Sequence, residues 1–204
     1  MLIKIYPDNT DRKKITQVTE TFRKGGLVAY PTDTVYAVGC GIDSHKAIEK
    51  LAGFKGCPVE DAAFSLICIN LSQASGYLKP LKQDMFRFIR QNIPGPFTFI
   101  LPYNNQLPSI LKSKRKTVGI RFSGNPVLNA ILEDMDIPLV TTSLYKSNDD
   151  PEYETDPELI YEQYGAEIDI IVDGGYGKSE PSTVVDCSGD EPEIIREGLG
   201  LLNL

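Results

Sequence analysis

Short apolar runs separated by polar breaks recur along this chain and predict strands and helices in alternation. The first part is typical: Leu2–Tyr6 and Leu27–Tyr30 are apolar runs of strand length. Between them, Asp11 can cap a helix that continues to Lys24, and Gly25-Gly26 ends it. Strands that alternate with helices predict an α/β fold.

The same alternation continues through the rest of the chain. Further helices are predicted after Ser44 and at Leu81–Gln91, Pro126–Met135 and Pro157–Tyr164; further strands are predicted at Phe64–Ile69, Phe97–Leu101, Val118–Phe122, Pro138–Ser143, Asp169–Val172, Ser182–Cys187 and Glu193–Arg196. The last two strands follow each other closely, so we expect them to be antiparallel. The polar, acidic stretch Lys146–Asp156 predicts a surface loop. With no repeat and no low-complexity linker, the pattern predicts one domain over residues 1–204, built on a mixed sheet covered by helices.

Composition narrows the class of protein. Hydrophobic residues make up 41% and charged residues 24%, as in ordinary globular proteins. No apolar run approaches the roughly 18–20 residues of a membrane-spanning helix, and charge interrupts the N-terminus too soon for a signal peptide. We therefore expect no membrane association and a cytoplasmic location. The cysteines show no C-x-x-C spacing and the single histidine, His45, has no partner at ligand spacing, so the sequence predicts neither a protein-bound metal nor a serine–histidine triad.

The net charge of −7 hides a division along the chain. Residues 1–121 hold 18 basic and 9 acidic residues, whereas residues 122–204 hold 3 and 19. Such an asymmetry predicts a basic surface that attracts phosphates. The alternative is that these charges are scattered and merely solvated, and for the loop at 112–116 alone both interpretations stay open. The residues proposed for this surface are Arg87, Arg90, Lys112, Lys114, Arg115 and Lys116.

Candidate ligand-binding residues gather at predicted strand ends. Hydroxyl residues, Gly and Pro are concentrated in four segments: Tyr30–Thr34, Pro94–Thr98, Thr141–Ser143 and Pro181–Thr183. In open α/β sheets, ligands bind outside the strand ends, and hydroxyls suit carboxylate or phosphate oxygens. Arg121 and Arg196 would add charge-assisted bonds. Each segment alone is more often structural, but together they predict a site for an anionic, nucleotide-like ligand.

The residues from Lys24 to Cys40, KGGLVAYPTDTVYAVGC, closely resemble the signature opening of the YrdC/YciO family. Further matching segments follow in order: KG at 55–56, PGPFT at 94–98, VGIR at 118–121, residues 138–143, GG at 174–175, PSTVVD at 181–186 and IREG at 195–198. The resemblance implies a YrdC-like fold, a twisted mixed parallel and antiparallel sheet with flanking helices that encloses a positively charged cleft. It also implies binding of ATP or AMP and of double-stranded RNA or tRNA.

The best understood branch of that family makes threonylcarbamoyl-AMP from threonine, bicarbonate and ATP for the tRNA modification threonylcarbamoyladenosine. By resemblance, Thr32, Tyr36, Thr98, Arg121 and Thr183 would surround threonine, and Lys55, Ser143, Ser182 and Arg196 would hold the nucleotide, with Lys55 and Arg121 as the catalytic pair. Such a transfer depends mainly on positioning and on cations, so it requires no histidine. Mg²⁺ would be held mainly by the phosphates of ATP, and tRNA-modification proteins are implied partners.

Two departures fall on the nucleotide side. Synthases of the family carry Lys-x-Arg and Ser-Ala-Asn, whereas this chain reads Lys55-Gly56-Cys57 and Ser143-Leu144-Tyr145. One fixed cation and one amide are therefore missing, and cysteine cannot replace the charge of arginine. These departures resemble the YciO branch. Three roles stay open: a synthase-like enzyme, a non-catalytic factor that binds double-stranded RNA or the ribosome, and a hydrolase of a threonylcarbamoyl adduct.

Overall fold

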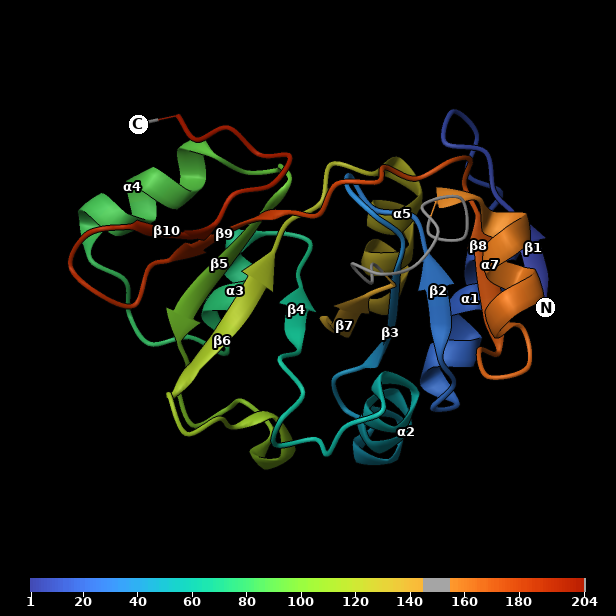
Figure 1. Cartoon of the computed structure of the whole chain (residues 1–204), viewed down its shortest axis with the longest axis horizontal. Coiled ribbons are helices and arrows are strands. Elements are labelled where there is room, and N and C mark those ends of the chain that lie inside the picture. Colours follow the sequence, from blue (N-terminus) through green and yellow to red (C-terminus); the bar gives the residue numbers. More distant parts are fainter. Residues whose placement is uncertain (145–154, 204) are drawn as a thin grey trace.

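The structure, a computed structural model, describes residues 1–144 and 155–203. Within these ranges ten strands form one sheet in the order β1-β8-β2-β3-β7-β4-β6-β5-β9-β10 (Figure 1). The strands are β1 (Leu2–Lys4), β2 (Val28–Tyr30), β3 (Ala37–Gly41), β4 (Ser65–Ile67), β5 (Phe97–Pro102), β6 (Thr117–Arg121), β7 (Leu139–Ser143), β8 (Ile170–Asp173), β9 (Thr183–Asp186) and β10 (Glu193–Arg196). The helices are α1 (Arg12–Arg23), α2 (His45–Lys55), α3 (Leu71–Ser75), α4 (Gln83–Gln91), α5 (Pro126–Met135) and α7 (Pro157–Tyr164), with a 3₁₀ turn η1 (Ser109–Leu111).

The predicted mixed sheet with flanking helices is confirmed. The pairs β1–β8, β2–β8, β4–β6 and β5–β9 are parallel, and the other neighbours are antiparallel, including the predicted pair β9–β10. All ten strands lie in one sheet, which agrees with one domain over residues 1–204, but that boundary stays a prediction. The predicted loop at 146–156 lies, except for Thr155 and Asp156, outside the described residues, as does Tyr145.

Helix ends follow the capping residues of the sequence. The side chain of Asp11 accepts the N–H of Lys13 at 2.9 Å at the start of α1, and Ser44 accepts the N–H of Ala47 at 3.3 Å at the start of α2. Gly25 follows α1 with φ +75°, a conformation that suits glycine. The helices therefore begin and end where local chemistry satisfies their free backbone groups.

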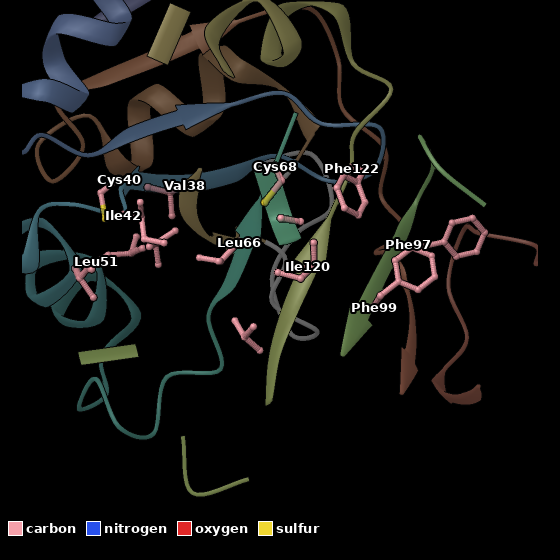
Figure 2. Close-up of a cluster of buried hydrophobic side chains, with 14 of the residues drawn as sticks. Val38, Cys40, Ile42, Leu51, Leu66, Cys68, Phe97, Phe99, Ile120 and Phe122 are labelled. Atoms are coloured by element: carbon pink, nitrogen blue, oxygen red, sulfur yellow. The ribbon is translucent and has the colours of Figure 1, made fainter. Parts of the chain in front are cut away.

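Two apolar clusters hold the helices on the sheet. One lies between α1, α5 and the strands β8, β2 and β3, and includes Phe22, Tyr30 and Leu128. The other lies on the opposite face beneath α2, α4 and α7. Figure 2 shows this second cluster running from Val38 and Leu51 through Leu66 and Ile120 to Phe99. The side chains of a strand alternate between the two faces of the sheet. Strand residues that alternate with those of the second cluster therefore lie on the other face, the one covered by α1 and α5, which we call the α1–α5 face.

Besides the 3₁₀ turn η1, two elements were not predicted. The strand β3 is made of Ala37-Val38-Gly39-Cys40-Gly41, residues with little strand propensity apart from valine. It forms because all five residues are buried between β2 and β7. The five-residue helix α3 follows Asn70, whose side chain accepts the N–H of Gln73 at 2.9 Å. Tertiary packing and a local cap decide these two elements.

The connection from β8 to β9 crosses the molecule. The two strands are consecutive in the chain, yet six strands lie between them in the sheet. A flat sheet would place them roughly 34 Å apart at about 4.8 Å per spacing, which is about the full reach of the segment 174–182. Midway, the N–H of Lys178 donates to the carbonyl of Thr34 at 2.9 Å. The segment therefore has little slack, and Figure 1 shows it running along the top of the molecule.

Candidate functional site

The loop 31–36 between β2 and β3 is held by its own hydroxyls. The hydroxyl of Thr32 donates to the carbonyl of Val35 at 2.7 Å and accepts the N–H of Thr34 at 3.0 Å. Thr32 and Thr34 are both buried. Because these bonds are satisfied within the loop, the loop has a fixed shape, with Asp33 directed away from it toward the end of β6.

Arg121 ends β6 against this loop and is only 6% exposed. Its Nη2 donates to Asp33 Oδ1 at 3.2 Å and to Thr34 Oγ1 at 2.9 Å. The hydroxyl of Ser123 also donates to Asp33 Oδ1, at 3.1 Å. Within the described chain, Arg121 Nε is buried without a hydrogen-bond partner. A buried guanidinium with a free N–H is suited to an anionic ligand, because an unsatisfied buried donor is costly.

The electrostatics of Arg121 connect it to Arg196. Burial is the largest influence and lowers the pKa of Arg121, whereas the Asp33 carboxylate opposes this shift. The positive charge of Arg196 lowers the same pKa further, so the two guanidinium groups repel each other. An anion close to both would relieve this repulsion.

Small and hydroxyl side chains continue the α1–α5 face beside Arg121. The register aligns Gly39, Thr141, Ser65 and Gly119 across β3, β7, β4 and β6. A Cβ at Gly119 would come within 2.5 Å of Ser65 Oγ and 3.1 Å of Thr98 Cγ2. Ser65 and Gly119 are only half-buried. Gly39 and Thr141 are buried beneath Tyr30, whose hydroxyl donates to Thr141 Oγ1 at 2.9 Å. The accessible part of the row, at Ser65 and Gly119, therefore forms a low, polar surface beside Arg121.

The strands β5 and β9 bring the remaining hydroxyls to this surface. Thr98 Oγ1 lies 2.8 Å from Ser182 Oγ. The guanidinium of Arg196 donates to the carbonyl of Ser182 at 2.7 Å, while the residue as a whole is exposed. The structure thus brings Thr98, Ser182 and Arg196 together, as the sequence predicted for one site.

The model of the Sua5/YciO/YrdC family, described as "Telomere recombination", matches residues 20–198. The chain belongs to the Sua5/YciO/YrdC family. It is similar to the protein YciO of Escherichia coli (strain K12), an uncharacterized protein, with 39% identity over 96% of this chain and 94% of that one. The crystal structure of E. coli YciO superposes with a TM-score of 0.90 at 38% identity, over 98% of this chain and 96% of that chain. The family resemblance seen in the sequence is confirmed.

A second solved structure of the Sua5/YciO/YrdC family carries a ligand. P. abyssi Sua5 complexed with L-threonine superposes with a TM-score of 0.87 at 25% identity. The match covers 97% of this chain but 57% of the Sua5 chain. The match therefore spans little more than half of the Sua5 chain.

Within this Sua5/YciO/YrdC fold, two predicted threonine-side residues already have satisfied hydroxyls. Tyr36 is fully buried, and its hydroxyl donates to the carbonyl of Gly175 at 2.7 Å and accepts the N–H of Gly174 at 3.2 Å. The hydroxyl of Thr183 donates to the carbonyl of Gly200 and accepts two backbone N–H groups. Both side chains hold neighbouring backbone, and their predicted contact with a ligand stays a prediction.

The predicted nucleotide-side residues are spread more widely. Lys55 is exposed at the end of α2, and Cys57 lies half-buried two residues later, beyond Gly56. Ser143 ends β7 opposite Ala37. The partner position of the Ser-x-Asn motif, Tyr145, is outside the described residues. The described structure therefore does not join Lys55 to Arg196 by any contact.

The predicted basic surface divides into two parts. Arg87 and Arg90 are exposed on α4, which packs on the face opposite Arg121. The other four, Lys112, Lys114, Arg115 and Lys116, are exposed in the connection between β5 and β6. Figure 1 shows α4 and this connection at opposite ends of β5. A single ligand-binding surface could therefore use the two arginines of α4 or the four basic residues of the β5–β6 connection, but not both groups together.

Metal-binding clusters and membrane-spanning helices are both absent from residues 1–144 and 155–203. No group of three or more His, Cys, Asp or Glu side chains is placed to hold a metal ion there. None of the helices in those ranges has the length and apolar character to cross a membrane.

Sequence reasoning missed the residues that shape the polar surface. Asp33, Ser123, Ser65 and Gly119 were not named as site residues, although Asp33 lies inside the signature segment. An acidic residue within an expected anion site would repel the ligand unless it pairs with an arginine. The position of Asp33 could therefore have predicted its pairing with an arginine such as Arg121. Ser65 and Gly119 become neighbours only through the pairing of β4 with β6, and this register cannot be read from the sequence.

Proposed function

We propose that this protein binds threonine and an adenine nucleotide over the polar surface beside Arg121 and acts as a threonylcarbamoyl-AMP synthase-like enzyme. The observation that carries the proposal is the buried Arg121 guanidinium with its unpartnered Nε. A carboxylate at this position would satisfy that N–H, and because Asp33 already balances Arg121, its charge would offset that of the nearby Arg196. The threonine bound to P. abyssi Sua5 supports an amino acid as the ligand.

The reaction would proceed in two steps. The amine of threonine attacks the carbon of bicarbonate, a C–N bond forms and water leaves, which gives a carbamate. A carbamate oxygen then attacks the α-phosphorus of ATP, and the bond from that phosphorus to the bridging oxygen of pyrophosphate breaks. Arg196 and Lys55 are the cations proposed to stabilise the phosphates, and Mg²⁺ held by those phosphates would neutralise the leaving pyrophosphate.

A pyrophosphate-release assay tests this proposal. Release should require threonine, bicarbonate and ATP together, and omission of any one should abolish it. A purified synthase of the same family run alongside serves as the positive control. If the wild type releases no pyrophosphate above the enzyme-free rate while that synthase does, the proposed synthase activity is wrong.

The two departures from the synthase motifs give a sharper arm of the same assay. The double variant Cys57→Arg, Tyr145→Asn restores the cation and the amide, and we expect it to release pyrophosphate about tenfold faster or more, since one such cation can contribute orders of magnitude. Lys46→Arg, on the exposed first turn of α2, is the matched control. Equal rates in both variants would show that these contacts do not limit the reaction.

A second candidate function is binding of double-stranded RNA without chemistry. The exposed group Lys112, Lys114, Arg115 and Lys116 favours it, because the described residues offer these side chains no salt bridge. Binding should weaken steeply with salt and weaken further when all four are changed to Gln. Neutralising Lys13 and Lys46, which are exposed elsewhere, is the control. If RNA binding does not depend on the salt concentration, or if the variant with all four substitutions binds as tightly as the wild type, this proposed function is wrong.

A further inference from the structure

The hydroxyl of Thr183 has no capacity left for a ligand. Thr183 is 1% exposed. Its Oγ1 donates to the carbonyl of Gly200 at 2.8 Å and accepts the N–H groups of Gly198 at 3.0 Å and Gly200 at 3.1 Å. A threonine hydroxyl offers one donor and two acceptor positions, and all three are occupied by the segment 198–200.

The same segment lies directly on the backbone that precedes Thr183. The N–H of Leu199 donates to the carbonyl of Pro181 at 2.9 Å. A Cβ at Gly198 would collide with the carbonyl oxygen of Pro181, and one at Gly200 with the ring of Phe97. The two glycines therefore allow a close backbone approach that no other residue would permit.

This packing fixes two residues of the polar surface. Ser182 comes immediately before Thr183, and its hydroxyl lies 2.8 Å from Thr98 Oγ1. Arg196 comes two residues before Gly198, and its guanidinium donates to the carbonyl of Ser182 at 2.7 Å. Arg196 itself is exposed on the edge strand β10, so the position of its long side chain depends on this bond and on the segment that follows it.

We infer that Thr183 is a positioning residue: it fixes the segment 196–200 against residues 181–183 and so places Arg196 and Ser182, without contacting the ligand itself. As far as it concerns a nucleotide, this inference rests on the proposed function. It replaces the expectation that Thr183 lies against threonine. It also makes the C-terminal segment, which carries no predicted ligand residue beyond Arg196, a necessary part of the site.

Three substitutions separate positioning from direct contact. Thr183→Val keeps the shape of the side chain and removes all three hydrogen bonds, whereas Thr183→Ser keeps the hydroxyl and should restore the wild-type behaviour. Gly198→Ala displaces the segment while Thr183 remains. Thr21→Val, at a half-buried position of α1 where the hydroxyl donates only to the carbonyl of Gln17 in the same helix, is the matched control. Thermal unfolding of each variant establishes that it is folded, and Gly198→Ala keeps the test open if Thr183→Val does not fold.

The first measurement needs no ligand. Amide hydrogen exchange of Gly198 and Gly200 should accelerate about tenfold or more in Thr183→Val, because both N–H groups lose their acceptor, and should stay slow in Thr183→Ser. Unchanged protection in Thr183→Val would overturn the inference. Hydrogen exchange therefore tests whether Thr183 anchors residues 198–200 even if the protein binds no nucleotide. Failure to bind a nucleotide would contradict the proposed function and not this anchoring.

The second measurement is the affinity for AMP, with threonine titrated in parallel. Thr183→Val and Gly198→Ala should each weaken AMP binding about tenfold, the scale of one charge-assisted contact, with threonine binding changed by less than about twofold on the same scale. In an Arg196→Ala background, Thr183→Val should have little further effect. A loss confined to threonine, or an equal loss of AMP affinity with and without Arg196, would show that Thr183 does not act through Arg196.

Discussion

Two arginines serve the same polar surface but are held in opposite ways. The Arg121 region (Thr32, Asp33, Thr34, Arg121 and Ser123) is buried, and its polar groups satisfy one another almost completely. The Arg196 region (Thr98, Ser182, Thr183 and Arg196) presents an exposed arginine on an edge strand, where its guanidinium donates to the backbone carbonyl of Ser182. Breaking the first should therefore cost stability, and breaking the second should cost ligand affinity.

The largest effect is expected from Asp33→Ala. It leaves the Arg121 guanidinium buried without its counter-ion, and removal of one partner of a buried ion pair typically costs about 3–5 kcal/mol. The free energy of unfolding from urea titration measures the loss. Asp84→Ala removes the carboxylate of an exposed pair with Arg87 and should leave stability nearly unchanged. Similar losses in both variants would mean that the burial of Arg121 is not what makes its pair important.

Tyr36→Phe should have the next largest effect. It leaves the N–H of Gly174 and the carbonyl of Gly175 without their shared hydroxyl, at a cost of about 1–3 kcal/mol for unsatisfied buried groups. Urea titration again measures it, with Tyr161→Phe on the exposed side of α7 as the control. A loss of stability no larger than in the control would show that water replaces the hydroxyl. It would also weaken the contrast between the buried Arg121 region and the exposed Arg196 region.

Arg196→Ala tests the other side of the comparison. Because the residue is exposed, we expect stability to fall by about 1 kcal/mol or less, while AMP affinity falls about tenfold. Isothermal titration with AMP and urea titration of the same sample give both numbers. A stability loss as large as that of Asp33→Ala would mean that the two regions do not differ in the way described.

The smallest effect concerns thiol reactivity and needs no substitution. Burial raises the pKa values of Cys40, Cys68 and Cys187 to about 12, so these groups stay protonated at pH 8 and should react slowly. Cys57 is half-buried and should be alkylated first by iodoacetamide, as read by mass spectrometry. AMP should slow that reaction if Cys57 lies beside the nucleotide. Equal labelling of all four cysteines would contradict the burial pattern.

The sequence predicted the elements better than the site. Strong periodicity and caps predicted α5 and α7 with the bounds observed, since local chemistry decides where such helices begin and end. The strand β3 was missed because its small residues become a strand only through burial between two neighbours. For the same reason no local pattern could show that Gly39, Ser65 and Gly119 share one face.

The site residues divide along a similar line. The pattern at the strand ends and the family resemblance both pointed to Arg121, Ser182 and Arg196, which the structure brings close. It could not show that the hydroxyls of Tyr36 and Thr183 are used by backbone groups far along the chain. Nor could charge counting show that α4 covers the opposite face from Arg121, because the side of the sheet taken by a helix depends on the chain path and is not set by its composition.

The crossing from β8 to β9 has a consequence for synthesis on the ribosome. Among the described strands, the outer edge of β5 pairs only with β9, and β1 joins β2 only through β8. Until residues 170–186 have been made, β5 offers a free apolar edge and β1 has no place in the sheet. Free edges of this kind invite pairing with other chains. The nascent protein is therefore at its most aggregation-prone just before its polar surface can be completed.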